Sequence, residues 1–124
     1  MSPETIIRDF IEAWNRRDRA AIQARLHPDA RVQGVPGPEA HGREAAMALC
    51  DPFLAAEMID WRIVHLAVAG QVVMTERVDR FRFAGRPAEV QAMGIFELDV
   101  EGRITAWRDY FDPTVFAFLA DEKA

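Results

Sequence analysis

The chain has 124 residues and a formal net charge of -5, and 50% of its residues are hydrophobic against 28% charged. This length supports a single domain, residues 1–124, and the composition is typical of a soluble globular protein, not of a disordered one. The negative charge and the scattered basic residues argue against a nucleic-acid partner, since phosphate binding requires a concentrated basic surface.

The first third of the sequence carries helix signals. Ser2 is a candidate N-cap followed by Pro3 at the first helical position, and an amphipathic helix is predicted to end near Asn15. Asp18 can cap a second helix, which should stop at residues 27–29 because Pro28 disfavours helical geometry in the residue before it. Two consecutive helices are therefore predicted.

A short strand, residues 30–35, and a loop at residues 36–38 are predicted next. A third helix is predicted from about residue 42 to residue 57, with Pro52 expected to kink it. These segments complete the helical part of the chain.

From residue 59 onward apolar and polar residues alternate, which is typical of strands. The short turns between the strands require antiparallel pairing. Helices followed by such strands predict an α+β domain, and a last apolar segment at residues 115–119 predicts a short closing helix. The expected strands are residues 59–68, 72–83, 88–100 and 103–112.

Apolar residues occupy both faces of the expected sheet. The face predicted to pack on the helices has Val73, Phe81, Val90, Ala92, Phe96, Leu98, Trp107 and Phe111. The other face mixes charges of both signs with Met74, Val78, Met93, Ile95, Ile104, Ala106 and Tyr110. A patch of this kind suits a homodimer interface, and the alternative is a half-buried outer face on a monomer.

Two segments place acids among large apolar side chains. Alternate residues of a strand share a face, so Arg77 and Asp79 should point into the helix-covered side, as should Asp109. Ionised side chains are rarely buried without a partner, and an arginine between two acids meets that need. Two hypotheses stay open: a catalytic acid pair, or a buried ion pair that fixes strand register.

Little in the sequence indicates a metal or a membrane. Cys50 is the single cysteine, which allows neither an internal disulfide nor a thiolate metal site. The histidines, His27, His41 and His65, lack the helical spacing of metal ligands. No apolar run approaches the ~20 residues of a membrane span. The N-terminus has an acid, Glu4, where a signal peptide would carry positive charge. We expect no metal, no membrane contact and a cytoplasmic protein.

The segments Thr-Glu-Arg-Val-Asp at 75–79 and Gly-Arg-Ile-Thr-Ala-Trp-Arg-Asp-Tyr-Phe-Asp at 102–112, in this order and spacing, resemble the limonene-1,2-epoxide hydrolase family. This family is a branch of the NTF2-like superfamily, with ketosteroid isomerases and SnoaL-type polyketide cyclases. The resemblance covers essentially the whole chain. It implies a cone-shaped α+β fold, with a curved mixed or antiparallel sheet and three to four helices packed on its concave face.

The resemblance also implies roles. Asp79 corresponds to the acid that protonates the epoxide oxygen, Asp109 to the base that takes a proton from water, and Arg77 to the bridge between them. One-step opening needs one neutral and one ionised carboxyl group, which a low-dielectric pocket with a shared arginine can supply. No cofactor is needed. A small hydrophobic, terpene-like epoxide would fit an apolar pocket formed by Phe81, Val90, Ala92, Trp107, Phe111 and Phe116.

One departure from the family concerns the attacking water. The family holds it with a tyrosine and an asparagine on the first strand, and the matching pocket positions here are Val32 and Gly34, whose side chains cannot hydrogen-bond. Gln33 lies between them and should face outward. Two alternatives to epoxide hydrolysis therefore stay open: a proton-transfer enzyme like the isomerases or cyclases, and a non-catalytic module that binds a hydrophobic ligand.

Overall fold

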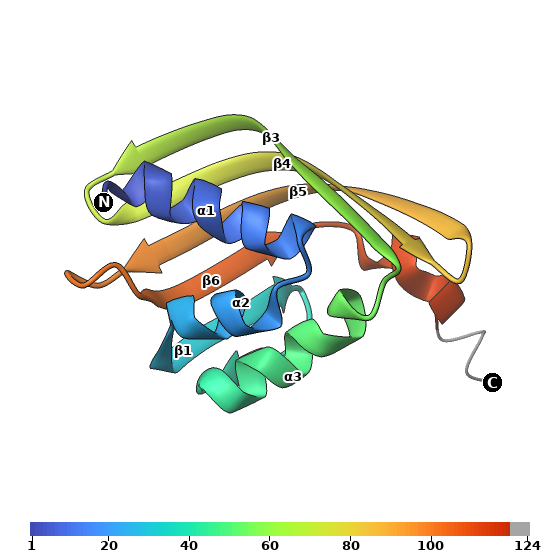
Figure 1. Cartoon of the computed structure of the whole chain (residues 1–124), viewed down its shortest axis with the longest axis horizontal. Helices are drawn as coiled ribbons and strands as arrows, with labels where there is room; N and C mark the ends of the chain where they lie inside the picture. Colours follow the sequence, from blue (N-terminus) through green and yellow to red (C-terminus); the bar gives the residue numbers. More distant parts are fainter. Residues whose placement is uncertain (120–124) are drawn as a thin grey trace.

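The computed structural model describes residues 1–119, which form a curved six-stranded sheet with helices on its concave side (Figure 1). The strand order is β2-β1-β6-β5-β4-β3. Neighbouring strands are antiparallel except for β1 and β6, which are parallel. The predicted α+β class with a mixed sheet is confirmed. The elements are α1 (Pro3–Asn15), α2 (Arg19–Arg25), β1 (Leu26–Val35), β2 (Glu39–His41), α3 (Arg43–Leu54), β3 (Met58–Ala69), β4 (Val72–Phe83), β5 (Arg86–Leu98), β6 (Ile104–Tyr110) and the 3₁₀ turn η1 (Pro113–Phe116).

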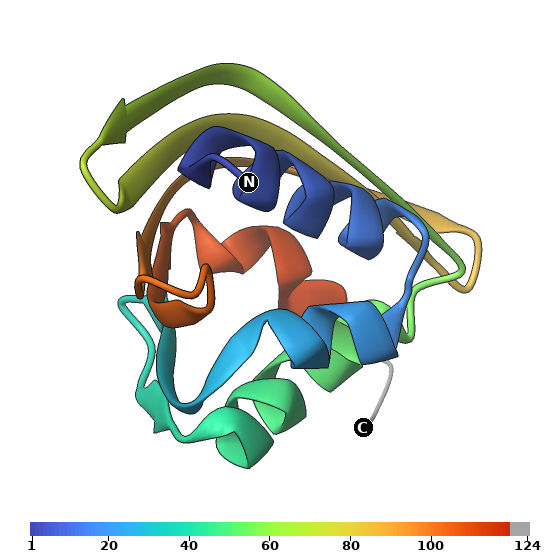
Figure 2. The same cartoon turned by 60° about the vertical axis from the view of Figure 1, so that its left-hand side comes forward.

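Helix α1 packs its apolar side against the concave face of the sheet (Figure 2). As predicted, the Ser2 hydroxyl accepts the Thr5 N–H at 3.1 Å and caps α1, and Asp18 caps α2. At the other end of α1, the Asn15 amide pairs with both backbone groups of Trp61 in β3, at 2.7 and 3.0 Å. These two bonds join the end of α1 to the sheet, and they satisfy the backbone N–H and C=O of Trp61 in the edge strand β3.

The region around β1 differs from the prediction. The strand begins at Leu26, not at residue 30, and its pairing with β6 shifts between Leu26 and Arg31. Pro28 lies in that irregular stretch, and a proline is tolerated in a strand where the ladder is already interrupted. The three-residue β2 was missed because so short a strand shows no periodicity. Helix α3 ends at Leu54, three residues earlier than expected.

The outer face also needs one correction. Ile104, predicted to point outward, is fully buried. Glu97 pairs with Ala106 whereas Leu98 pairs with Ile104, so Thr105 is an extra residue in β6. Such a bulge reverses the alternation of side chains, which turns Ile104 into the core. The Thr105 hydroxyl donates to the Glu97 carbonyl at 3.1 Å beside the bulge.

The rest of the outer face stays open in the single chain. Met74, Met93 and Tyr110 are 39%, 47% and 44% exposed, and the Arg108–Glu97 ion pair lies beside them in the sheet. Within residues 1–119 no helix has both the length and the apolar character needed to cross a bilayer.

The predicted closing helix begins instead as the 3₁₀ turn η1. The Asp112 carboxylate accepts the Thr114 N–H at 3.0 Å and starts the turn immediately after the last strand. Phe116 in η1 packs edge-on against Phe53 of α3, with ring centroids 5.1 Å apart. This contact brings the C-terminal segment and α3 together over one end of the sheet.

Candidate active site

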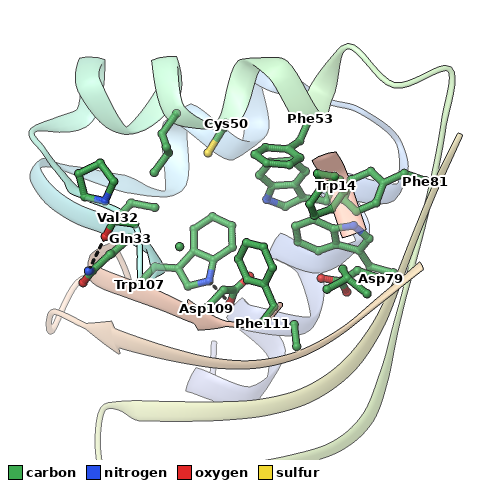
Figure 3. Close-up of a pocket in the computed structure, with 18 residues that line it drawn as sticks. Trp14, Val32, Gln33, Cys50, Phe53, Asp79, Phe81, Trp107, Asp109 and Phe111 are labelled. Carbon is green, nitrogen blue, oxygen red and sulfur yellow. Dashed lines mark hydrogen bonds between the residues drawn. The ribbon is translucent and has the colours of Figure 1, made fainter. Parts of the chain in front are cut away.

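A cavity of about 230 Å³ lies between the concave face of the sheet, α3 and η1 (Figure 3). Its wall is mainly aromatic and aliphatic. The structure places all eight residues predicted for the pocket on this wall: Val32, Gly34, Phe81, Val90, Ala92, Trp107, Phe111 and Phe116. Asp79 and Asp109 are the two acids that line it. Arg77 lies behind them, with no exposed side-chain surface.

Arg77 joins the two acids through its guanidinium group. Its Nε and Nη2 donate to the two oxygens of Asp79 at 3.0 and 2.9 Å. Its Nη1 and Nη2 donate to the two oxygens of Asp109 at 3.2 and 2.6 Å. The fifth N–H, on Nη1, bonds the Thr75 hydroxyl at 2.9 Å. All five donors of the guanidinium are therefore used, which fixes both carboxylates relative to each other.

The sheet register explains how Arg77 reaches a strand that does not neighbour its own. Thr75 of β4 pairs with Gly94 of β5, and Gly94 pairs with Asp109 of β6. The guanidinium lies over this row. A Cβ at position 94 would clash with Arg77 Nη1 and would lie 2.5 Å from Asp109 Oδ1. Glycine at this position therefore leaves the space in which the arginine crosses β5.

Two tryptophans complete the polar network. The Trp107 indole Nε1 donates to Asp109 Oδ1 at 2.7 Å (Figure 3). The Trp61 ring lies against the guanidinium, with Arg77 Cζ 4.9 Å from its centroid. A cation over an indole face gains electrostatic energy, most when both are desolvated, as here. Both rings hold charged groups that the apolar surroundings would otherwise disfavour.

Burial and neighbouring charges change the pKa of Asp79 and of Arg77. Burial raises the pKa of the Asp79 carboxyl to about 6; the positive charge and hydrogen bonds of Arg77 oppose this, and the negative charge of Asp109 adds to it. Burial alone would lower the pKa of Arg77, but the charges of Asp109 and Asp79 outweigh it and raise that pKa above its ordinary value. The arginine is thus always charged, and one neutral carboxyl group makes the whole cluster neutral.

Sequence reasoning named the acids and the arginine as a group but did not assign Thr75, Gly94 or Trp61 to the site. A glycine inside a strand often marks a close approach of another group, so Gly94 was the available signal. Thr75 shares the face of Arg77 by alternation. Nothing in the sequence pairs Trp61 with Arg77, because the contact depends on the register of β3 against β4.

The structure places Val32 and Gly34 on the cavity wall, and Gly34 pairs with Asp109 across β1 and β6. Gln33, expected to face outward, also borders the cavity. Its side-chain amide donates to the Gly37 carbonyl at 2.8 Å, so it secures the loop after β1. Within residues 1–119, no three His, Cys, Asp or Glu side chains converge as metal ligands would.

Comparison with known proteins agrees with this geometry. A family model described as the limonene-1,2-epoxide hydrolase catalytic domain matches residues 1–121. The chain belongs to this family. The epoxide hydrolase EphG of Mycobacterium tuberculosis is similar, with 29% identity over 119 residues that cover 90% of this chain and 79% of that protein.

Similar solved structures share the fold of this chain. An LEH-like epoxide hydrolase of M. tuberculosis has a TM-score of 0.79 and 27% identity, covering 94% of this chain and 88% of that one. The epoxide hydrolase/cyclase-like enzyme SalBIII has a TM-score of 0.82 at 20% identity, covering 90% and 92%. An NTF2-like protein of unknown function from Cytophaga hutchinsonii has a TM-score of 0.76 at 22% identity, covering 92% and 93%. The last two show the shared NTF2-like fold.

Proposed function

We propose that this protein opens a small hydrophobic epoxide with water in one step, using Asp79 as acid, Asp109 as base and Arg77 as the bridge. The observation that carries the proposal is the arginine that binds both carboxylates at the wall of an apolar cavity. A buried ion pair that served only strand register would not need two acids facing a cavity. Membership of an epoxide hydrolase family supports the same chemistry.

The mechanism follows from the charges. Asp79, whose pKa is raised to about 6, gives its proton to the epoxide oxygen as the carbon–oxygen bond breaks. Asp109 takes a proton from the water whose oxygen forms the new bond to carbon. Asp79 then becomes ionised and Asp109 neutral, so the net charge around Arg77 does not change. Since Arg77 donates to both oxygens of each acid, it stabilises the charge on either one.

Asp109 is suited to the role of base. Its Oδ1 accepts from Trp107 and Arg77, and its Oδ2 accepts from Arg77 alone. Its side chain is 13% exposed, against 4% for Asp79. Asp109 therefore has more hydrogen-bond donors and is more accessible from the cavity than Asp79, which suits the group that must contact the attacking water.

The cavity suggests the size and polarity of the substrate. An engineered apolar cavity of about 150 Å³ accommodates benzene, so about 230 Å³ suits a somewhat larger hydrocarbon skeleton. Phe81, Phe111 and Phe116 on the wall would contact such a skeleton, and Asp79 and Asp109 line the same cavity. A terpene-like epoxide has this combination of bulk and a single polar group.

The test is diol formation by the purified protein on a panel of terpene and other apolar epoxides. Asp79→Asn and Asp109→Asn should each lower turnover ~100-fold or more, since each removes one proton transfer. Asp112→Asn is the matched control, because this exposed acid only caps η1 and asparagine caps equally well. Parental turnover in either active-site variant would exclude the mechanism. Isomerisation of an unsaturated ketosteroid without any diol would favour the proton-transfer alternative.

We also propose that the outer sheet face forms a homodimer interface. Met74, Met93 and Tyr110 form an exposed apolar group on it, and the Arg80–Glu89 and Arg108–Glu97 pairs supply both signs of charge. A two-fold axis would place such a surface against itself, which would bury the apolar group and allow each charge to meet its opposite.

A further inference from the structure

The Trp107 indole holds one side of the Asp109 carboxylate. The two residues share a face of β6, and the indole Nε1 donates to Asp109 Oδ1 at 2.7 Å (Figure 3). Arg77 Nη1 donates to the same oxygen at 3.2 Å. A carboxylate oxygen has two lone-pair sites, so these two donors occupy Oδ1 fully. A proton taken from the attacking water therefore needs the other oxygen, Oδ2.

Asp109 Oδ2 keeps a lone pair for this task. Among residues 1–119 its donor is Arg77 Nη2 at 2.6 Å, and the same nitrogen donates to Asp79 Oδ2 at 2.9 Å. The two N–H bonds of a planar guanidinium nitrogen diverge by about 120°, which puts the two acceptor oxygens about 5 Å apart. That separation leaves room for an epoxide oxygen at one carboxyl group and a water oxygen at the other.

The Trp107 side chain cannot follow a carboxylate that rotates, because aromatic rings of α1 and β5 enclose it. Its ring centroid lies 5.3 Å from that of Phe10, 5.4 Å from that of Phe96 and 5.9 Å from that of Trp14. A side chain in so dense a core changes its rotamer only if its neighbours move. The indole N–H is therefore a fixed donor, and turning Oδ1 away from it would leave a buried N–H without a partner.

We propose that Trp107 is a positioning residue of the reaction, whose indole N–H holds the Asp109 carboxylate so that Oδ2 alone serves the nucleophile. The proposal rests on the proposed function, because it concerns the same base. A base with one fixed oxygen reaches water on one side of the epoxide, so opening should occur mainly at one of the two epoxide carbons. A carboxylate that is free to rotate would serve water at either carbon.

The experiment measures this selectivity with a meso epoxide such as cyclohexene oxide. Attack of water at its two equivalent carbons gives mirror-image trans-diols, so the enantiomer ratio of the diol reports which carbon is attacked. The reaction without protein forms both enantiomers equally and is subtracted. The parent should form one enantiomer in excess. Trp107→Phe keeps an aromatic ring but removes the donor, and it should lower the enantiomer ratio several-fold and kcat about tenfold or more, with a smaller change in KM.

Trp14→Phe is the matched control. It makes the same exchange in the same aromatic cluster and on the wall of the same cavity, but among residues 1–119 the Trp14 N–H has no acceptor. Trp14→Phe should therefore keep the enantiomer ratio of the parent, even where the lost packing lowers stability and turnover.

The pH dependence separates positioning from packing. On the acidic side of the pH–rate profile, Trp107→Phe should lose activity at a higher pH than the parent, because a carboxylate that has lost a donor binds a proton more tightly. Lost packing alone would scale the rate equally at every pH, as expected for Trp14→Phe.

The outcomes distinguish this proposal from the proposed function. If the parent opens the epoxide and Trp107→Phe keeps both its kcat and its enantiomer ratio, the role of Trp107 is overturned while epoxide hydrolysis stands. An equal loss of selectivity in Trp14→Phe, or a parent that forms both enantiomers equally, also overturns that role alone. A parent that opens no epoxide overturns both proposals.

A spectroscopic measurement covers the case in which Trp107→Phe does not fold. The chain has three tryptophans, so the ¹⁵N-labelled protein gives three indole N–H signals. The Trp107 signal is assigned from the contacts of its ring with Phe10 and Phe96. Removal of the acceptor in Asp109→Ala should move this signal the most and speed its exchange with solvent several-fold. An unmoved Trp107 signal would contradict the hydrogen bond on which the proposal depends.

Discussion

Raising the pH through about 6 should switch off epoxide opening, because Asp79 must carry a proton to act as the acid. Its pKa is raised by burial to about 6. At pH 7 roughly one site in ten would be protonated, and each further pH unit lowers this about tenfold. The rate of the chemical step should fall in the same proportion. Initial rates between pH 5 and 8, corrected for reaction without protein, measure it. A flat profile over that range would refute the assignment of Asp79.

The same group should affect stability in a defined direction. The folded state binds the Asp79 proton more tightly than the unfolded chain, whose pKa is 3.8. The contribution to the free energy of unfolding is therefore fully present below pH 3.8 and is lost as the pH rises through about 6. The difference of about two pH units corresponds to at most about 3 kcal/mol.

The comparison with Asp79→Asn removes the contribution of the carboxyl groups that do not interact with Asp79, because those groups titrate equally in both proteins. Other carboxyl groups shift in the opposite direction. Hydrogen bonds lower the pKa of Asp99 and of Asp112, so the stability that these two groups contribute to the fold is lost as the pH falls. The stability of the parent minus that of the variant should fall between pH 4 and 8, measured by urea unfolding. A difference that rises with pH would contradict the burial argument.

Three other perturbations follow from the geometry. Gly94→Ala should lower turnover ~100-fold or more and cost about 1–3 kcal/mol in urea unfolding, since the added Cβ clashes with Arg77 and Asp109; parental activity would show that the network tolerates displacement. Arg77→Lys should also lose activity, because three donors on one nitrogen cannot replace a five-donor fork, and unchanged initial rates would refute the bridging role. Met93→Glu should shift a dimer toward the monomer mass of 14.0 kDa in light scattering; a parent that is already monomeric at all concentrations would remove the basis for the interface.

The family relationship extends over nearly the whole chain, yet the water-holding pair on the first strand is absent. Val32 and Gly34 occupy those positions, and Phe111 fills the space that opens there. The acid pair and its arginine are complete. The chain therefore combines a complete Asp-Arg-Asp group with an apolar first strand, and this combination directs the choice of substrates to test.

The sequence by itself determined which side chains share a face. Strand alternation is local, so the period of two put Arg77, Asp79 and Asp109 on the helix-covered side. Capping is local too, and Ser2 and Asp18 begin α1 and α2 as predicted. Alternation failed at Ile104, where the bulge at Thr105 inserts one residue, and at Gln33, which borders the cavity. A bulge depends on the partner strand, which a single-strand pattern cannot reveal.

The tertiary structure decided which strands lie side by side, and with that the chemistry of the site. The parallel pairing of β1 with β6 joins segments about 75 residues apart, and it places Gly34 beside Asp109. The register of β5 between β4 and β6 puts Gly94 under the guanidinium, which lets Arg77 reach Asp109. Side-chain periodicity fixes a face but not a neighbour, because the choice of partner strands depends on closing the whole sheet around its core.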